Sequence, residues 1–88
     1  MIKERLIELF NEERTSAWFE KQTGIDRYRW GNIRSGKVRV SSEDIDAVVK
    51  LFPNWAFWLA TGNIAPEIGQ TSPAYDQANE TSGKQNAG

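Results

Sequence analysis

An all-α fold is predicted by three features of the sequence. Apolar residues recur at helical spacing, capping residues precede them, and glycine or proline stands where each segment would end. Five helices are expected over 2–13, 16–22, 27–35, 42–52 and 54–61. Val38 and Val40 alternate with Lys37 and Arg39 too briefly to predict a strand. With 88 residues, the chain is long enough for one small domain with a single core.

The first helix, residues 2–13, is predicted to turn one apolar face to the core and to carry glutamates on much of the rest. The core face consists of Ile2, Leu6, Leu9 and Phe10. Lys3 and Arg5 on this helix are interpreted as ordinary surface charges.

The second helix is predicted to begin after a cap at Thr15 or Ser16. It supplies two large apolar side chains, Trp18 and Phe19, and we assign Trp18 to the core or to a subunit contact rather than to base stacking. The helix must stop at Gly24, because glycine adopts a positive φ without steric cost.

The third helix has a buried side and a polar side. Asp26 is expected to cap it, and Trp30 and Ile33 fall together on the side that faces the core. The opposite side carries Tyr28, Gly31, Asn32 and Ser35, with Arg27 at its edge. Arg29 and Arg34 lie on the two flanks. Such a stripe suits a DNA major groove, where Asn pairs with adenine, Arg pairs with guanine and flanking guanidinium groups meet phosphates.

The charge distribution indicates a polyanion-binding face. The whole chain carries a net charge of −1, yet residues 14–39 contain seven basic and two acidic side chains. Lys37 and Arg39, in a predicted loop, extend this basic segment towards a ligand backbone. A solvated charged surface that binds nothing is the alternative. Gly31, which costs about 1 kcal/mol inside a helix, either allows close approach to DNA or is a tolerated weak position.

The fourth helix is expected to be capped by Ser41 or Ser42, with acidic residues in its first turn, and to stop before Pro53. Asn54 is the predicted cap of the fifth helix, and Gly62 is its predicted end.

The fifth helix carries more aromatic surface than one core face can bury, in Trp55, Phe57 and Trp58. These residues are candidates for a dimer interface. The alternative is that the following tail folds back and covers them.

The chain is expected to divide into a DNA-binding domain, 1–62, and a flexible tail, 63–88. Residues 63–75 are predicted to pack loosely and residues 76–88 to be disordered, because few apolar side chains are available to offset the entropy of ordering.

Several function classes are disfavoured by composition. The chain has no cysteine and no histidine, so we expect no disulfide, no metal site, no conventional catalytic triad and no enzymatic activity. Neither a cofactor motif nor a small-molecule sensor is evident. No apolar run approaches the ~18 residues of a membrane span. A cytoplasmic location is expected.

The spacing of the second and third helices resembles a known family. Phe19-x4-Gly24-x5-Trp30-x2-Ile33-x2-Gly36 is similar to the helix-turn-helix of Cro/repressor-type (Xre family) proteins, which have the lambda-repressor-like fold. Residues 58–62, WLATG, resemble the W-L-x-T-G ending of the fifth helix in phage-type regulators. The resemblance covers residues 1–62. It implies five helices, DNA binding by the third, and a homodimer on a palindromic operator.

Site residues follow from this resemblance by position. The base-reading candidates are Arg27, Tyr28, Gly31, Asn32 and Ser35. The phosphate-binding candidates are Ser16, Arg29, Arg34, Lys37 and Arg39.

The chain departs from the family at Glu20, where alanine is usual, and at Trp30, where Ile or Val is usual. Both departures indicate altered packing between the second and third helices.

The function predicted is a sequence-specific regulator of transcription, a phage-type repressor that reads double-stranded DNA. The alternative is a non-catalytic protein-interaction module, such as an antitoxin or anti-repressor, that uses the basic and aromatic face or the last helix. RNA binding through exposed aromatic residues has less support, because Trp30 is assigned inward.

Overall fold

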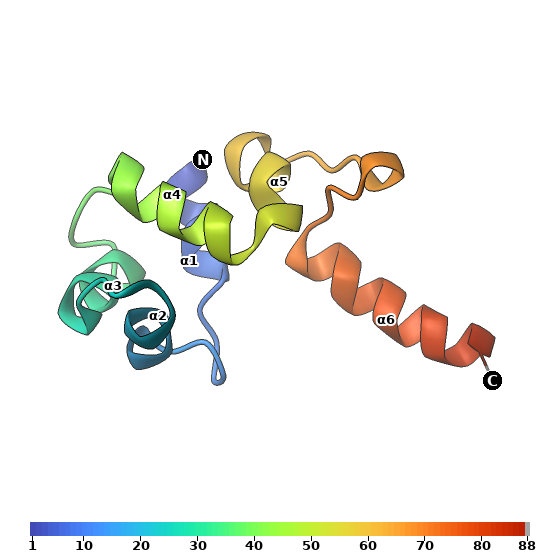
Figure 1. Cartoon of the computed structure of the whole chain (residues 1–88), viewed down its shortest axis with the longest axis horizontal. Helices are drawn as coiled ribbons and strands as arrows, with labels where there is room; N and C mark the ends of the chain where they lie inside the picture. The colour runs from blue at the N-terminus through green and yellow to red at the C-terminus, as the bar shows by residue number, and fades with distance from the viewer. Residues whose placement is uncertain (88) are drawn as a thin grey trace.

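The computed structural model describes the backbone of residues 1–87 and the side chains of residues 1–80. Its α-helices are α1 (Ile2–Glu8), α2 (Ser16–Thr23), α3 (Arg27–Arg34), α4 (Ser42–Leu51), α5 (Ala56–Thr61) and α6 (Pro73–Ala87). Two short 3-10 helices, η1 (Pro53–Trp55) and η2 (Pro66–Ile68), flank α5. No strand occurs among the described residues, so the all-α prediction is confirmed, with six α-helices instead of five. Helices α1–α5 form the body, and α6 extends away from it (Figure 1).

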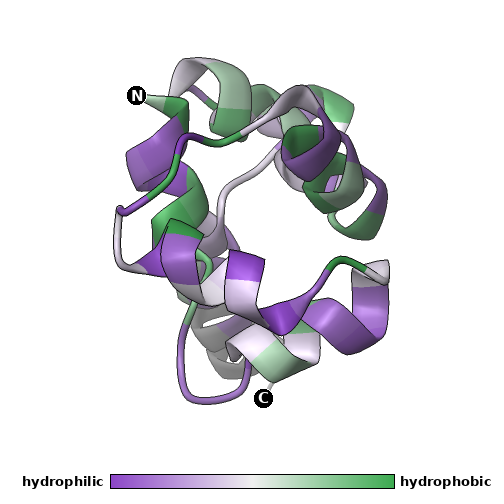
Figure 2. Cartoon of the chain, turned by 90° about the vertical axis from the view of Figure 1, so that its left-hand side faces the viewer, coloured by the Kyte–Doolittle hydropathy of each residue, from purple (hydrophilic) through white to green (hydrophobic). Residues whose placement is uncertain are grey.

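Helices α1–α5 pack around one hydrophobic core. Its buried apolar residues are Leu6, Leu9, Phe10, Phe19, Trp30, Ile33, Val48 and Leu59. Three aromatic rings meet at its centre, since the Phe19 ring centroid lies 4.6 Å from that of Phe10 and 4.9 Å from that of Trp30. Each helix of the body carries both hydrophobic and hydrophilic residues, as expected of amphipathic helices that pack around one core (Figure 2). None of the helices in the described part of the chain is long and apolar enough to cross a membrane.

The first helix is shorter than predicted. It ends at Glu8, and residues 10–14 form a loop, although Leu9 and Phe10 remain buried. The Asn11 side chain accepts hydrogen bonds from the backbone N–H groups of Glu13 and Arg14 (2.9 and 2.6 Å). This local side-chain acceptor competes with the helical pattern, as asparagine commonly does.

The predicted cap of the fifth helix is wrong. Asn54 lies inside η1, and α5 begins at Ala56 without a side-chain cap. The Asn54 amide instead donates to the Asp76 carboxylate (3.1 Å) at the start of α6. Gly62 ends α5 with a φ of 82°, as its position predicted.

The segment after Gly62 is more structured than expected. Residues 63–72 turn back so that the Thr71 backbone N–H donates to the Asn54 carbonyl (2.8 Å), and Pro73 begins helix α6. Trp55 Nε1 donates to Asp76 (2.8 Å), which anchors the first turn of α6 to η1. Composition did not predict this helix, because the contacts that hold it to η1 are hydrogen bonds to the Asp76 carboxylate. Residues 76–80, which were predicted to be disordered, lie within α6. Residue 88 and the side chains of 81–87 lie outside the described residues.

Candidate nucleic-acid interface

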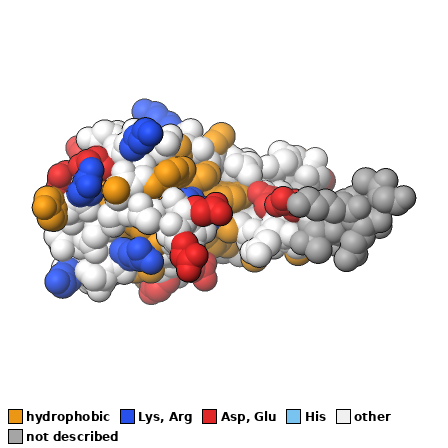
Figure 3. All heavy atoms as spheres, turned by 90° about the horizontal axis from the view of Figure 1, so that it is seen from below, with side chains coloured by type: hydrophobic (Ala, Val, Ile, Leu, Met, Phe, Trp, Pro, Cys, Tyr) orange, Lys and Arg blue, Asp and Glu red, His pale blue; other side chains and the backbone are white. Residues whose placement is uncertain are grey.

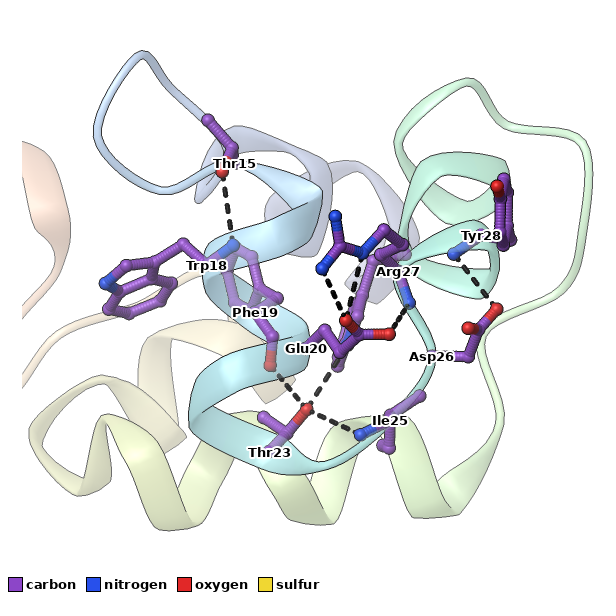
Figure 4. A network of polar contacts seen from close by, with 10 residues as sticks. Thr15, Trp18, Phe19, Glu20, Thr23, Ile25, Asp26, Arg27 and Tyr28 are labelled. Carbon is purple, nitrogen blue, oxygen red and sulfur yellow. Dashed lines mark hydrogen bonds and ion pairs between the residues drawn. The ribbon is translucent and has the colours of Figure 1, made fainter.

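A short turn fixes the angle between α2 and α3. Gly24 ends α2 with a φ of 78°, and Asp26 caps α3 by accepting from the Tyr28 backbone N–H (3.1 Å). Thr23 fastens the turn to both helices, because its hydroxyl donates to the Phe19 carbonyl (2.6 Å) and accepts from Trp30 Nε1 (3.2 Å). The predicted roles of Gly24 and Asp26 are confirmed, and Figure 4 shows the turn with these bonds.

The two sides of α3 differ sharply in burial. Trp30 and Ile33 on the inner side are completely buried. On the outer side Tyr28 is 78% exposed, and Asn32 and Ser35 are also exposed. The packing of α3 therefore follows the predicted division by face.

Gly31 does not share the exposure of its predicted neighbours. It is half-buried, and a Cβ atom added to it would lie 3.7 Å from the Ser16 hydroxyl at the start of α2. That distance is an ordinary van der Waals contact. Gly31 and Ser16 thus lie side by side at the α2–α3 contact, at the edge of the outer face of α3.

Arg27 is held by Glu20. One Glu20 oxygen accepts from the Arg27 backbone N–H (2.9 Å), and the other contacts Nε (2.9 Å) and Nη2 (2.8 Å). These hydrogen bonds, that from the backbone N–H first, lower the pKa of Glu20, and the same pairing raises the pKa of Arg27. In Figure 4 Arg27 bends back to Glu20, whereas Tyr28 points away from α2. Glu20 thereby serves as a second acceptor at the start of α3.

Arg29, a predicted phosphate ligand, pairs with Asp44. Its Nε and Nη2 donate to the two carboxylate oxygens of Asp44 (2.9 and 2.6 Å), and Nη2 also lies 3.3 Å from the Arg39 carbonyl. Asp44 is 1% exposed, so its charge requires these partners. The pair ties α3 to α4 and holds the intervening loop. The Arg29 side chain is nevertheless 37% exposed, and its assignment to phosphate binding stays a prediction.

Asp44 has a dual role at the start of α4. Ser41, not Ser42, caps this helix, and Asp44 reciprocates by accepting from the Ser41 backbone N–H (2.8 Å) and hydroxyl (2.9 Å). Burial by itself would raise the pKa of Asp44. The hydrogen bonds from Arg29 and Ser41 outweigh that effect, so the pKa of Asp44 lies below its ordinary value.

The other predicted phosphate-binding cations, Arg34, Lys37 and Arg39, lie at the end of α3 or in the loop that follows it. Lys37 and Arg39 are exposed in the loop after α3, and the Arg34 guanidinium lies 5.6 Å above the Phe10 ring. Lys3 from α1 joins them, because its ammonium group donates to the Gly36 carbonyl (3.2 Å). On the face seen in Figure 3, blue side chains lie over the α2–α3 end together with red ones, and further red side chains lie towards the opposite end.

The aromatic dimer candidates are only partly available. Trp55 is half-buried and stacks on Phe52 at 4.4 Å between ring centroids, and Trp58 is half-buried as well. Phe57 is 40% exposed. Two further exposed apolar residues, Ile64 and Ile68, follow α5. The alternative, that the tail covers the aromatic residues, applies to Trp55, because its Nε1 donates to Asp76 in the tail.

Three residues of this region were missed or misread from sequence. Glu20 was noted only as a packing anomaly, Asp44 as a first-turn acidic residue and Lys3 as a surface charge. The spacing carried a signal for Asp44, since a serine three residues before an acidic residue is a capping-box pattern. No sequence signal joins Lys3 to Gly36, because only the tertiary fold brings them together.

The chain was compared with known proteins. No family model matches it, and no curated protein matches it. Among solved structures it is similar to Pf6r from the filamentous phage Pf6 of Pseudomonas aeruginosa PA01, with a TM-score of 0.79 and 29% sequence identity. The match covers 91% of this chain and 94% of Pf6r. This chain therefore shares nearly its whole architecture with a phage protein.

Proposed function

We propose that this chain is a sequence-specific DNA-binding regulator of phage type, with the helix-turn-helix of the lambda-repressor-like fold. In this proposal α3 enters the major groove, α2 lies across the DNA backbone, and the protein acts as a repressor by occupying an operator without catalysing a reaction. The likeness to a filamentous-phage protein supports the phage assignment.

The observation that carries the proposal is the two-sided character of α3. Its inner residues Trp30 and Ile33 are fully buried, so the helix is fixed, while Tyr28 and Asn32 project into solvent. A short helix held by its inner face against the domain, with polar side chains on its outer face, is what major-groove readout requires. Asn32 is suited to adenine and Arg27 to guanine.

In this proposal the contacts with the DNA phosphate backbone come from residues around α3. Lys37 and Arg39 extend from the loop that follows it, and Lys3 lies beside that loop. The other phosphate-binding candidates are Ser16 at the start of α2 and Arg29 and Arg34 on α3. Such contacts give affinity that depends steeply on salt and not on sequence.

We further propose that two copies bind one palindromic operator. Phe57, Ile64 and Ile68 supply exposed apolar surface for a second copy near the end of the domain. In a dimer the two α3 helices would enter half-sites about 34–36 Å apart.

The test is a binding selection from random-sequence duplexes, followed by measurement of retention against salt. The proposal expects a palindrome to be enriched and retention on random duplex to fall steeply as salt rises. Arg39→Ala should weaken binding to all sequences alike and reduce the salt dependence. A protein that shows no retention on duplex DNA at low salt would contradict the proposal and favour the protein-interaction module.

A further inference from the structure

The Glu20–Arg27 pair joins the start of α3 to α2. The Glu20 side chain is 31% exposed and that of Arg27 55% exposed, so the pair lies at the surface, where other groups can reach it. Both oxygens of Glu20 are engaged by Arg27, one through the backbone N–H and the other through the guanidinium. The carboxylate therefore fixes the start of α3 and the direction of its first side chain together.

The geometry leaves one edge of the guanidinium for another acceptor. Arginine has five N–H groups in a rigid fork, and Nε with Nη2 forms the edge that faces Glu20. The end of the fork, formed by Nη1 and Nη2, is the part that can donate in parallel to guanine O6 and N7. A guanidinium that is already held along one edge loses less side-chain conformational entropy when it binds a base.

The same carboxylate opposes binding to the phosphate backbone. It neutralises Arg27 and places a negative charge beside the start of α3, where a DNA strand would repel it. An unpaired arginine at this position would bind phosphates of any sequence.

We propose that Glu20 is a positioning residue for sequence discrimination, which aims Arg27 at a guanine and withholds it from phosphates. This inference rests on the proposed function. It assigns a role to the position at which the chain departs from the alanine usual in the family it resembles. Glu20 thus weakens binding to DNA in general while strengthening preference for the operator.

The test compares wild type, Glu20→Gln, Arg27→Ala and the double variant on the selected operator and on a scrambled duplex, over a series of salt concentrations. Glutamine retains an oxygen that can accept from the Arg27 backbone N–H, so the start of α3 keeps an acceptor. Glu67→Gln is the matched control, since it removes the same charge on η2, at the far end of the body from α3 (Figure 1). Melting temperatures verify that each variant folds.

For Glu20→Gln we expect tighter binding to the scrambled duplex, with a salt slope steeper by about 0.9 for one additional phosphate contact. The ratio of operator to scrambled affinity should fall roughly tenfold, within the range of one bidentate base contact. In the Arg27→Ala background the substitution Glu20→Gln should leave that ratio unchanged. Glu67→Gln should preserve the ratio.

Three results would overturn the inference in distinguishable ways. If wild type prefers its operator and Glu20→Gln keeps the same ratio, Glu20 does not position Arg27, and the proposed function stands. Glu20 is likewise no positioning residue if Glu20→Gln lowers the ratio equally with and without Arg27. If wild type binds neither duplex at low salt, the proposed function fails and this inference fails with it.

Discussion

Helix α3 carries two arginine–carboxylate pairs whose arginines are two residues apart, and the pairs differ in burial. Arg29 donates twice to Asp44, a carboxylate that is 1% exposed, whereas Arg27 pairs with Glu20, which is 31% exposed. The first pair crosses from α3 to α4 and the second from α3 to α2. Side chains that look equivalent in a basic run therefore have different tasks.

The difference shows how burial decides what an ion pair can do. A buried carboxylate cannot lose its partner without a large desolvation penalty, so Arg29 is fixed to the fold. A pair near the surface is worth little to stability, because water can solvate either member when they separate. Arg27 can therefore exchange its carboxylate partner for a ligand at a lower cost than Arg29 can.

The largest expected effect is loss of the buried pair. Asp44→Ala removes the partner of Arg29 and the capping box of α4, and we expect a loss of about 3 kcal/mol in the free energy of unfolding. Urea denaturation measures it. Asp46→Ala on the same helix is the control, because Asp46 forms an exposed pair with Lys50. A loss no larger than that of the control would remove the distinction between the two pairs.

The buried pair should also make stability depend on pH. The pKa of Asp44 is lowered in the folded state, so its contribution is present above its ordinary pKa of about 3.9 and is lost as pH falls through the lower folded value. Asp44→Asn should be less stable than wild type by about 2 kcal/mol near neutral pH. The gap should narrow in acid. Urea midpoints measured across acidic pH test this, and a gap of constant size would contradict it.

A smaller effect is expected at Gly31, which lies at the α2–α3 contact beside Ser16. Gly31→Ala should raise stability by up to about 1 kcal/mol, because alanine favours a helix and its Cβ would meet Ser16 at an ordinary contact distance. Thermal unfolding measures the gain. If glycine is retained for close approach to DNA, the stabilised variant should bind the operator more weakly. Unchanged operator affinity would leave Gly31 without a role in binding.

The smallest effect on stability is expected for the exposed pair. Glu20→Gln should leave the urea midpoint close to that of wild type, since the pair is solvated and glutamine can still accept a hydrogen bond. A fall as large as that of Asp44→Ala would show that the Glu20–Arg27 pair also holds the fold together.

Much of the domain could be predicted from sequence because its signals are local. Gly24, Asp26 and the burial of Trp30 and Ile33 all follow from capping, positive φ and helical spacing. The pairing of Arg29 with Asp44 could not be predicted, since only the tertiary fold brings together two residues that are fifteen positions apart. Helix α6 was missed because Trp55 and Asn54 reach Asp76 through polar contacts, which composition does not reveal.

The proposed reading of DNA by the outer face of α3 is tested most directly at Asn32, which is exposed and whose neighbour Ile33 is fully buried. The measurement is the affinity of Asn32→Ala for the selected operator and for a scrambled duplex at one salt concentration. We expect a loss of roughly 1–3 kcal/mol on the operator and unchanged binding to the scrambled duplex. Wild-type affinity for both duplexes would show that Asn32 reads no base and that α3 does not enter the groove by this face.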